Sequence, residues 1–418
     1  MSVRITTLEN GLRIATDTMT QVETVSAGVW VGAGGRFESP LEVGVSHLLE
    51  HMTFKGTQKR TAQQIVEEIE DVGGHLNAYT TRETTAYYVK VLKEDTALAI
   101  DIIADLALNA VIDEDELKKE RSVIIQEIHQ SFDTPDDIVY DYFQDAAFPD
   151  QPLGRPVLGT ADLIAQMPRD TVTAYLKRHY APHNMVLSVA GNITHEEVVD
   201  LARTHFSGGK KNGVEVPAPA QYRGGDFREK RDLEQVHLLI GFEGVPYDAD
   251  DIYAVSIFSS LFGGGMSSRL FQEVREKRGL VYSVYSYSSS YTDTGLFGIY
   301  AGTSKKDLGE LIPVVADEIN KAVESLSAEE VARARAQMKA STLMSLESPS
   351  GRAEQLARQM MVFGRPIPVS EIVEKIDAVD VDAALGAGRK IMGSTPTLTA
   401  LGPIDDFETY ECFSGRLG

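Results

Sequence analysis

The sequence repeats one succession of local patterns, and the second copy begins about 210 residues after the first. In each copy an alternating, strand-like segment ends in a glycine-containing turn: VETVSAGVWVGAGG from Val22 and LEQVHLLIGFEGVP from Leu233. A helical pattern follows, then strand-like segments rich in Thr, Tyr and Val, and then two further helical patterns. A repeat of this length predicts two homologous domains that arose by duplication, and not a solenoid of short units.

The segment between the two copies, SGGKKNGVEVPAPAQYRGG from Ser207, is dense in Gly, Pro and Lys, which is typical of an exposed connection. We therefore predict a first domain over residues 1–206, a linker over 207–227 and a second domain over 228–418. Strands followed by helices within each half indicate an α+β fold, in which helices cover a mainly antiparallel sheet. A length of 418 residues with 43% hydrophobic residues suits two such globular domains.

The net charge of −22, from 62 acidic and 40 basic residues, disfavours binding to nucleic acid or to an anionic membrane surface. It is compatible with cationic partners, although solubility alone explains it equally well. The apolar runs are shorter than the roughly 20 residues of a membrane-spanning helix, and the N-terminus lacks the features of a signal or transit peptide. With a single cysteine, Cys412, these observations favour a cytoplasmic protein without a membrane span.

The stretch HLLEHMTFKGT, which begins at His47, contains the most informative short motif of the chain. His47 and His51 lie one helical turn apart on one face, close enough to bind one metal ion, and Glu50 projects near that face. The order His-x-x-Glu-His is the inverse of the zincin motif and is a known zinc-protease signature. An ordinary amphipathic helix with two half-buried histidines explains the same five residues.

A catalytic zinc ion needs three protein ligands, so a further His, Asp or Glu must come from a second element. The helical segment ELKKERSVIIQEIHQ offers Glu120 and Glu127, two turns apart on one face and close to an apolar run. A carboxylate in such surroundings needs a charge partner, and a zinc ion would be one. For Glu120, in the charged half of the segment, a solvated helix edge is the competing interpretation.

The second copy of the repeat provides an internal comparison for these polar residues. When the two copies are aligned on their helical patterns, none of the five candidate residues has a counterpart that could bind a metal. Ile257, Ser260 and Leu261 stand opposite His47, Glu50 and His51, and Ala334 and Ser341 stand opposite Glu120 and Glu127. Their joint absence indicates one metal site, present in the first half only.

These residues resemble the zinc motif of the pitrilysin and insulinase-type metallopeptidases, in particular the processing-peptidase branch with its bacterial homodimeric relatives. Further similar stretches are GGHLNAYTTRETTAYY from Gly73, LGRPVLGT from Leu153, HYAPHNMVLSVAGN from His179 and SSRLFQEVREKRGLVYSV from Ser267. The resemblance covers essentially the whole chain. It implies one Zn²⁺ per chain with His47, His51 and Glu127 as ligands, Glu50 as the general base and Glu120 as a carboxylate that orients the site.

The resemblance also assigns substrate-binding residues in both halves. Arg275 and Tyr282 of the second domain would help to hold the substrate, and Asn77 and Ala78 would lie on an exposed strand edge. The alternating pattern of HLNAYTTRETTAYYVKV agrees with such an edge, which can accept an extended peptide as an added strand. An edge strand without a ligand remains the alternative for these two residues.

The sequence thus predicts a zinc-dependent endopeptidase that cleaves short or unfolded, basic, presequence-like peptides inside a closed chamber, as a homodimer. In this prediction zinc lowers the pKa of a bound water and Glu50 takes its proton. Two other functions stay open: a non-catalytic scaffold or assembly subunit with the same fold, and peptide binding followed by slow degradation. The stretch FGGGMSSRLF from Phe262 lacks the Gly-Lys-Ser/Thr ending of a phosphate-binding loop, so Gly263, Gly264 and Gly265 are interpreted as loop glycines.

Overall fold

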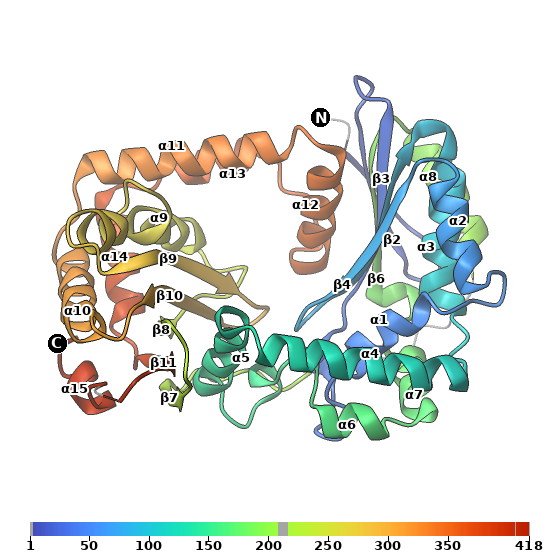
Figure 1. The fold of residues 1–418 in the computed structure, drawn as a ribbon. Helices are drawn as coiled ribbons and strands as arrows, with labels where there is room; N and C mark the ends of the chain where they lie inside the picture. Colours follow the sequence, from blue (N-terminus) through green and yellow to red (C-terminus); the bar gives the residue numbers. More distant parts are fainter. Residues whose placement is uncertain (1–2, 208–215, 406, 418) are drawn as a thin grey trace. The chain divides into compact units, whose positions relative to one another are not determined.

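The structure is a computed structural model that describes residues 3–207, 216–405 and 407–417. Its contacts divide the chain into two compact units, and each unit contains segments from both halves of the sequence (Figure 1). Unit 1 comprises Met1–His129, Arg155–Ala218 and Leu343–Pro366, and unit 2 comprises Gln130–Gly154, Pro219–Thr342 and Ile367–Gly418.

Unit 1 is built on a six-stranded sheet with β4 at one edge. The strands β2 and β6 are parallel and the other neighbours are antiparallel. In spatial order the strands are β1 (Val3–Thr7), β2 (Arg13–Thr18), β6 (Met185–Gly191), β3 (Thr24–Val31), β5 (Thr85–Leu92) and β4 (His75–Thr80).

The helices of unit 1 gather mainly on one face of this sheet, where they enclose the larger of its two apolar clusters. Short 3₁₀ segments at Gly35–Phe37, Lys93–Asp95 and Pro182–Asn184 connect them to the strands. The helices are α1 (Val45–Thr53), α2 (Ala62–Glu70), α3 (Thr96–Asn109), α4 (Glu114–Phe132), α6 (Ala161–Gln166), α7 (Arg169–His179) and α8 (His195–His205).

Unit 2 repeats this plan with a five-stranded sheet in which β9 is an edge strand. Its one parallel pair, β7 and β11, corresponds to the parallel pair β2 and β6 of unit 1. In spatial order the strands are β7 (Gly225–Lys230), β11 (Thr397–Gly402), β8 (Val236–Glu243), β10 (Gly295–Thr303) and β9 (Val281–Ser290). The predicted fold class, two homologous α+β domains with mainly antiparallel sheets, is therefore confirmed.

One face of the second sheet is covered by helices of the C-terminal half, which enclose a separate apolar cluster. A turn of π-helix at Phe271–Glu276 precedes β9, and a 3₁₀ turn lies at Pro152–Gly154. The helices are α9 (Ile252–Gly263), α10 (Leu308–Glu324), α11 (Ala328–Ser345), α13 (Val369–Asp377), α14 (Val381–Met392) and α15 (Tyr410–Ser414). Among the helices of the described residues, none combines the length and the apolar composition that a membrane crossing requires.

The remaining face of each sheet is covered by a helix from the other half of the sequence. Helix α12 (Pro349–Val362) packs on β2, β3 and β6 of unit 1, where Leu356 and Met360 belong to the same apolar cluster as Trp30. Helix α5 (Pro135–Ala147) packs on β7, β8 and β11 of unit 2 through Val139 and Phe143. Phe143 comes so close to β8 that a Cβ at Gly241 would lie 2.0 Å from its ring.

This exchange of helices differs from the predicted domain boundaries, which followed the course of the chain. Residues 130–154 belong to unit 2 because α5 buries its apolar face on the second sheet. Residues 343–366 belong to unit 1 because α12 buries its apolar face on the first sheet. The end of the predicted linker is also different, since Gly225 already begins strand β7. Residues 208–215 of that linker lie outside the described residues.

Candidate metal centre

The N-terminal end of helix α1 is held by the buried carboxylate of Glu38, which accepts hydrogen bonds from backbone N–H groups there. Gly44, in the left-handed region with φ +93°, and Ser46 donate backbone hydrogen bonds of 2.8 Å each to the two oxygens of Glu38. The hydroxyl of Ser46 donates a third, of 2.6 Å. Glu38 is only 3% exposed, and burial raises its pKa to about 7 although these hydrogen bonds oppose the shift. The position of α1 is therefore set by a side chain well before the helix.

The two faces of α1 differ in character. Its apolar residues, among them Leu48 and Met52, are buried in the core of unit 1. His47 and His51 lie on the other side, half-buried, with their ring centroids 4.6 Å apart. The helix spacing expected from the sequence therefore places both imidazoles on one face.

Helix α4 brings a carboxylate to these two rings. The Oε2 atom of Glu127 lies 3.8 Å from Nε2 of His47 and 3.6 Å from Nε2 of His51. One ligand atom from each of the three residues lies within 4.8 Å of the others. Within the part of the chain that the structure describes, this is the one group of three or more His, Cys, Asp or Glu side chains with such spacing.

This donor set fits a zinc ion. Two imidazole nitrogens and one carboxylate oxygen are a known ligand set of catalytic zinc, and bonds of about 2.0–2.1 Å at tetrahedral angles place such donors about 3.3 Å apart. The two observed distances to Glu127 are only slightly longer. Burial, with the neighbouring His51, lowers the pKa of His47 to about 4, which keeps its ring in the neutral form that binds metals.

Glu120 lies two helical turns before Glu127 on α4 and contacts the Nδ1 atom of His51. Its Oε2 atom lies 3.1 Å from Nδ1 of His51. Its Oε1 atom forms an ion pair of 2.8 Å with Nζ of Lys55. The residue is 4% exposed, so a solvated helix edge does not describe it. A hydrogen bond from Nδ1–H of His51 to Glu120 leaves Nε2 free to bind a metal, a common arrangement around metal-binding histidines.

Glu50 projects from α1 beside the same cluster without joining the three ligand atoms. The Thr80 hydroxyl donates a hydrogen bond of 2.5 Å to its Oε2 atom. Burial raises the pKa of Glu50, while the hydrogen bond from Thr80 acts in the opposite direction. A half-buried carboxylate next to a metal site, with one oxygen held by a hydroxyl, is placed to take up and return a proton.

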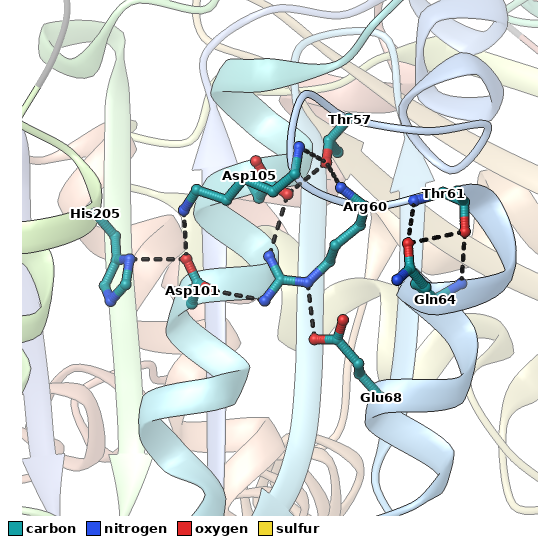
Figure 2. Close-up of polar contacts among 9 residues, drawn as sticks. Thr57, Arg60, Thr61, Gln64, Glu68, Asp101, Asp105 and His205 are labelled. Atoms are coloured by element: carbon teal, nitrogen blue, oxygen red, sulfur yellow. Dashed lines mark hydrogen bonds and ion pairs between the residues drawn. The ribbon is translucent and has the colours of Figure 1, made fainter.

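The segment that follows α1 is anchored to α3 by a network of charged side chains (Figure 2). Arg60 forms ion pairs of 2.6 Å with Asp101, 3.2 Å with Asp105 and 2.8 Å with Glu68. The hydroxyl of Thr57 also donates to Asp105, which is 1% exposed. Since a buried carboxylate requires partners, this network fixes the chain leaving the C-terminal end of α1.

Asn77 and Ala78 lie on β4, as the resemblance implied. Among the described strands β4 pairs with β5 alone, so its other edge carries no strand. Asn77 is exposed, and its side-chain oxygen accepts a 2.8 Å hydrogen bond from the backbone N–H of Ala78. The edge that was expected to accept a peptide is therefore present in unit 1.

Arg275 and Tyr282 lie next to each other in unit 2. The guanidinium carbon of Arg275 is 5.5 Å from the ring centroid of Tyr282 and 4.8 Å from that of Phe271. Tyr282 is 77% exposed although it lies on the edge strand β9. The pair thus presents a cation and an aromatic ring together on one surface of unit 2.

The counterparts of His47, His51 and Glu120 serve the core of unit 2, whereas Ser341, the counterpart of Glu127, is exposed. Ile257 is fully buried in α9, and Leu261 and Ala334 are 6% and 1% exposed.

The three glycines after Phe262 differ in part from the expected loop. Gly263 is the last residue of α9 rather than a loop residue, and a Cβ there would lie 2.4 Å from the backbone nitrogen of Ser286 on β9. Gly264 and Gly265 follow the helix.

Sequence reasoning missed Glu38, Lys55 and Thr80 as parts of this site. Lys55 lies one turn after His51, a spacing that could have been noticed. The hydrogen bonds of Glu38 and Thr80 join residues that are distant in sequence or outside a standard capping motif, so no local pattern identifies them.

Comparison with known families assigns the chain to a class of peptidases. The chain belongs to the insulinase family of peptidases: the profile of "Insulinase (Peptidase family M16)" matches residues 13–161 and that of "Peptidase M16 inactive domain" matches residues 166–338. The predicted family is thereby confirmed, and the second description agrees with the missing ligands of α9 and α11.

Similar proteins from bacteria and eukaryotes extend over nearly the whole chain. An uncharacterized zinc protease of Rickettsia felis is 41% identical over 96% of this chain and 98% of its own. A probable mitochondrial-processing peptidase subunit beta of Arabidopsis thaliana is 37% identical over 99% of this chain and 81% of its own, and the rat subunit beta is 35% identical over 96% and 85%. These names support a metalloprotease that uses zinc.

Two solved structures share the fold. A protease from Helicobacter pylori superposes with a TM-score of 0.89 at 21% identity, covering 96% of this chain and 99% of its own. A chain of complex III from Candida albicans superposes with a TM-score of 0.87 at 24% identity, covering 99% of both chains.

Proposed function

We propose that this chain is a zinc-dependent endopeptidase with one Zn²⁺ per chain. His47, His51 and Glu127 bind the ion, Glu50 is the general base, and Glu120 orients His51. The observation that carries the proposal is the approach of Glu127 Oε2 to within 3.8 Å and 3.6 Å of the two Nε2 atoms. Three neutral or anionic donors of these types from two helices are the protein part of a catalytic zinc site, which leaves one position for water or substrate.

A zinc ion held by His47, His51 and Glu127 would act as a Lewis acid and would lower the pKa of a coordinated water to about 7. Glu50 accepts the proton of the attacking water through its free oxygen, because Thr80 holds the other oxygen. It then returns the proton to the amine that leaves when the peptide bond breaks. Glu120 and Lys55 keep His51 in one orientation throughout.

The substrate is proposed to be an extended, basic, presequence-like peptide that is short or unfolded. The free edge of β4, with Asn77 and Ala78, offers backbone hydrogen bonds that do not depend on sequence. Arg275 and Tyr282 of unit 2 contribute further contacts to the substrate. The net charge of −22 attracts cationic peptides, and two relatives are named as processing-peptidase subunits.

We further propose that the chain works as a homodimer that encloses its substrate in a closed chamber in the cytoplasm. The exposed, unpaired Cys412 is compatible with a reducing compartment. The processing-peptidase relatives are named as subunits, which makes assembly with a second chain an expected property.

The test combines zinc analysis with cleavage of a basic presequence-like peptide and its Arg-to-Ala variant. The native protein should bind one zinc ion and cleave the basic peptide faster. Glu50→Gln should retain zinc and lower kcat/KM by about 10²- to 10⁴-fold, the contribution of a general base. The matched change Ser260→Ala, at the equivalent place in α9, should leave both properties unchanged.

Each departure from this result has a defined meaning. Bound zinc without cleavage by the native protein would support the non-catalytic scaffold instead. A protein that does not bind zinc would contradict the metal site, and equal rates on the two peptides would remove the preference for arginine.

A further inference from the structure

Strand β4 presents its residues alternately to the two faces of the sheet. Leu76 and Ala78 pack against the cluster that includes α1, whereas Tyr79 packs against the cluster formed with α12 on the opposite face. Because side chains alternate along a strand, Thr80 shares the face of Leu76 and Ala78. The strand that carries the predicted peptide-binding edge therefore also directs Thr80 toward the metal helix.

The hydroxyl of Thr80 makes one short hydrogen bond, 2.5 Å to Oε2 of Glu50. Its other neighbour is the hydroxyl of Thr85 at 3.5 Å. The Thr85 hydroxyl donates a 3.0 Å hydrogen bond to the carbonyl of Ala33, so its proton is already used. An ionised carboxylate can only accept, so the proton of Thr80 points to Glu50.

The place of Thr85 makes this arrangement rigid. Thr85 is fully buried on β5 and is paired with Thr80 in the register of β4 and β5. The backbone of Thr80 is therefore fixed by its pairing with β5. The carboxylate of Glu50, by contrast, is joined to its backbone through two rotatable methylene groups. A hydrogen bond from a fixed donor restricts the orientation of that carboxylate.

We propose that Thr80 is a positioning residue that holds Oε2 of Glu50 and leaves Oε1 to receive the proton of the attacking water. Thr80 lies two residues after Ala78, so a peptide paired along β4 is connected to the general base through one strand. Thr80 acts through Glu50 and does not contact the ion or the scissile bond. This inference rests on the proposed peptidase function.

The test compares Thr80→Val, which keeps the shape but removes the hydroxyl, with Thr80→Ser, which keeps the hydroxyl. Both are assayed as full-length protein for bound zinc, kcat and KM on the basic peptide. We expect Thr80→Val to lower kcat by about 10- to 100-fold with zinc content unchanged and KM within about threefold. Thr80→Ser should recover kcat to within about threefold of the native value.

A second readout separates positioning from a structural role. In a Glu50→Gln background, adding Thr80→Val should lower the residual activity by less than about twofold, because the residue through which Thr80 acts is already disabled. Thr204→Val, a threonine of α8 whose hydroxyl bonds the carbonyl of Asp200, serves as the matched control and should behave as the native protein.

Several results would overturn the inference while leaving the peptidase function intact. These are native kcat in Thr80→Val, a serine variant as slow as the valine variant, loss of zinc in either, or a full further loss in the Glu50→Gln background. If the valine variant does not fold, the serine variant and Thr80→Ala are compared by the same criteria. Absence of cleavage by the native protein would instead contradict the proposed function itself.

Discussion

Helices α1 and α9 follow equivalent strands, β3 and β8, in the two copies of the repeat. In α1 one face carries His47, Glu50 and His51, and a buried carboxylate holds the first turn. In α9 the equivalent positions of the two histidines carry Ile257 and Leu261, which are buried in the core of unit 2. Asp251, before the first residue of α9, makes no side-chain hydrogen bond to the helix.

The two units thus use one framework for different purposes. In unit 1 the exposed side of the helix is kept polar and is surrounded by further polar groups, among them Glu120 and Thr80. In unit 2 the positions equivalent to His47, His51 and Glu120 add to the apolar core. A fold of this kind can lose a metal site without losing stability, because apolar residues at those positions bury additional surface.

The largest expected difference between the two helices is in stability. Ile257→Ala should lower the free energy of unfolding by about 2–5 kcal/mol, because it leaves a cavity in a closely packed core. His47→Ala, in metal-free protein, should lower the free energy of unfolding by about 1 kcal/mol or less, since His47 is not part of the apolar core of unit 1. Urea unfolding followed by circular dichroism measures both. Equal losses would contradict the distinction between a core helix and a site helix.

The two copies of the repeat should also differ in how much they contribute to the pH dependence of stability, because only the first copy contains Glu38. Its folded pKa of about 7 lies above the ordinary value of 4.5, so the folded protein binds more protons between these values. The free energy of unfolding should therefore fall as pH rises from about 4.5 to 7, by up to about 3 kcal/mol from this residue. Glu38→Gln should lack this part of the slope in unfolding measured at pH 5, 6, 7 and 8.

The control for Glu38 comes from the second copy of the repeat. Asp248 lies 210 residues after Glu38 (248 − 38 = 210) and is exposed. Asp248→Asn should leave the pH profile as in the native protein. A native slope in Glu38→Gln would show that another group is responsible.

The smallest expected effect concerns Glu120, whose counterpart is Ala334. Glu120→Gln keeps the size of the side chain but weakens the hydrogen bond that orients His51, so the Kd for zinc should rise about 10- to 100-fold. Competition with a chelator measures it. Glu114→Gln, on the exposed side of α4, is the matched control, and an unchanged Kd in Glu120→Gln would separate Glu120 from the metal site.

Much of the fold could be predicted from local patterns, because strand alternation and helical periodicity recur in both copies. The exchange of α5 and α12 could not be predicted in this way. An amphipathic helix shows that one face will be buried, but its sequence does not identify the sheet that buries it. The boundaries at 206 and 228 therefore followed the chain and not the packing.

The same limit applies to the site. His47 and His51 were predictable since their contact depends only on helix geometry. A third ligand was required, the residues alone offered both Glu120 and Glu127, and the family resemblance selected Glu127. The partner of Thr80 is 30 residues away on another element. Strand alternation gives the face of Thr80, but only the packing of α1 on that face determines that Glu50 is its acceptor.

The exchanged helices also constrain how the protein can be made. The face of the first sheet formed by Ala15, Trp30 and Val186 stays uncovered until residues 349–362 leave the ribosome, because α12 is the helix that covers it. The N-terminal half expressed alone would expose this apolar surface to water and to other chains. Neither half of the gene therefore encodes a complete folding unit, and cutting the chain between the two repeats would yield two unfinished proteins.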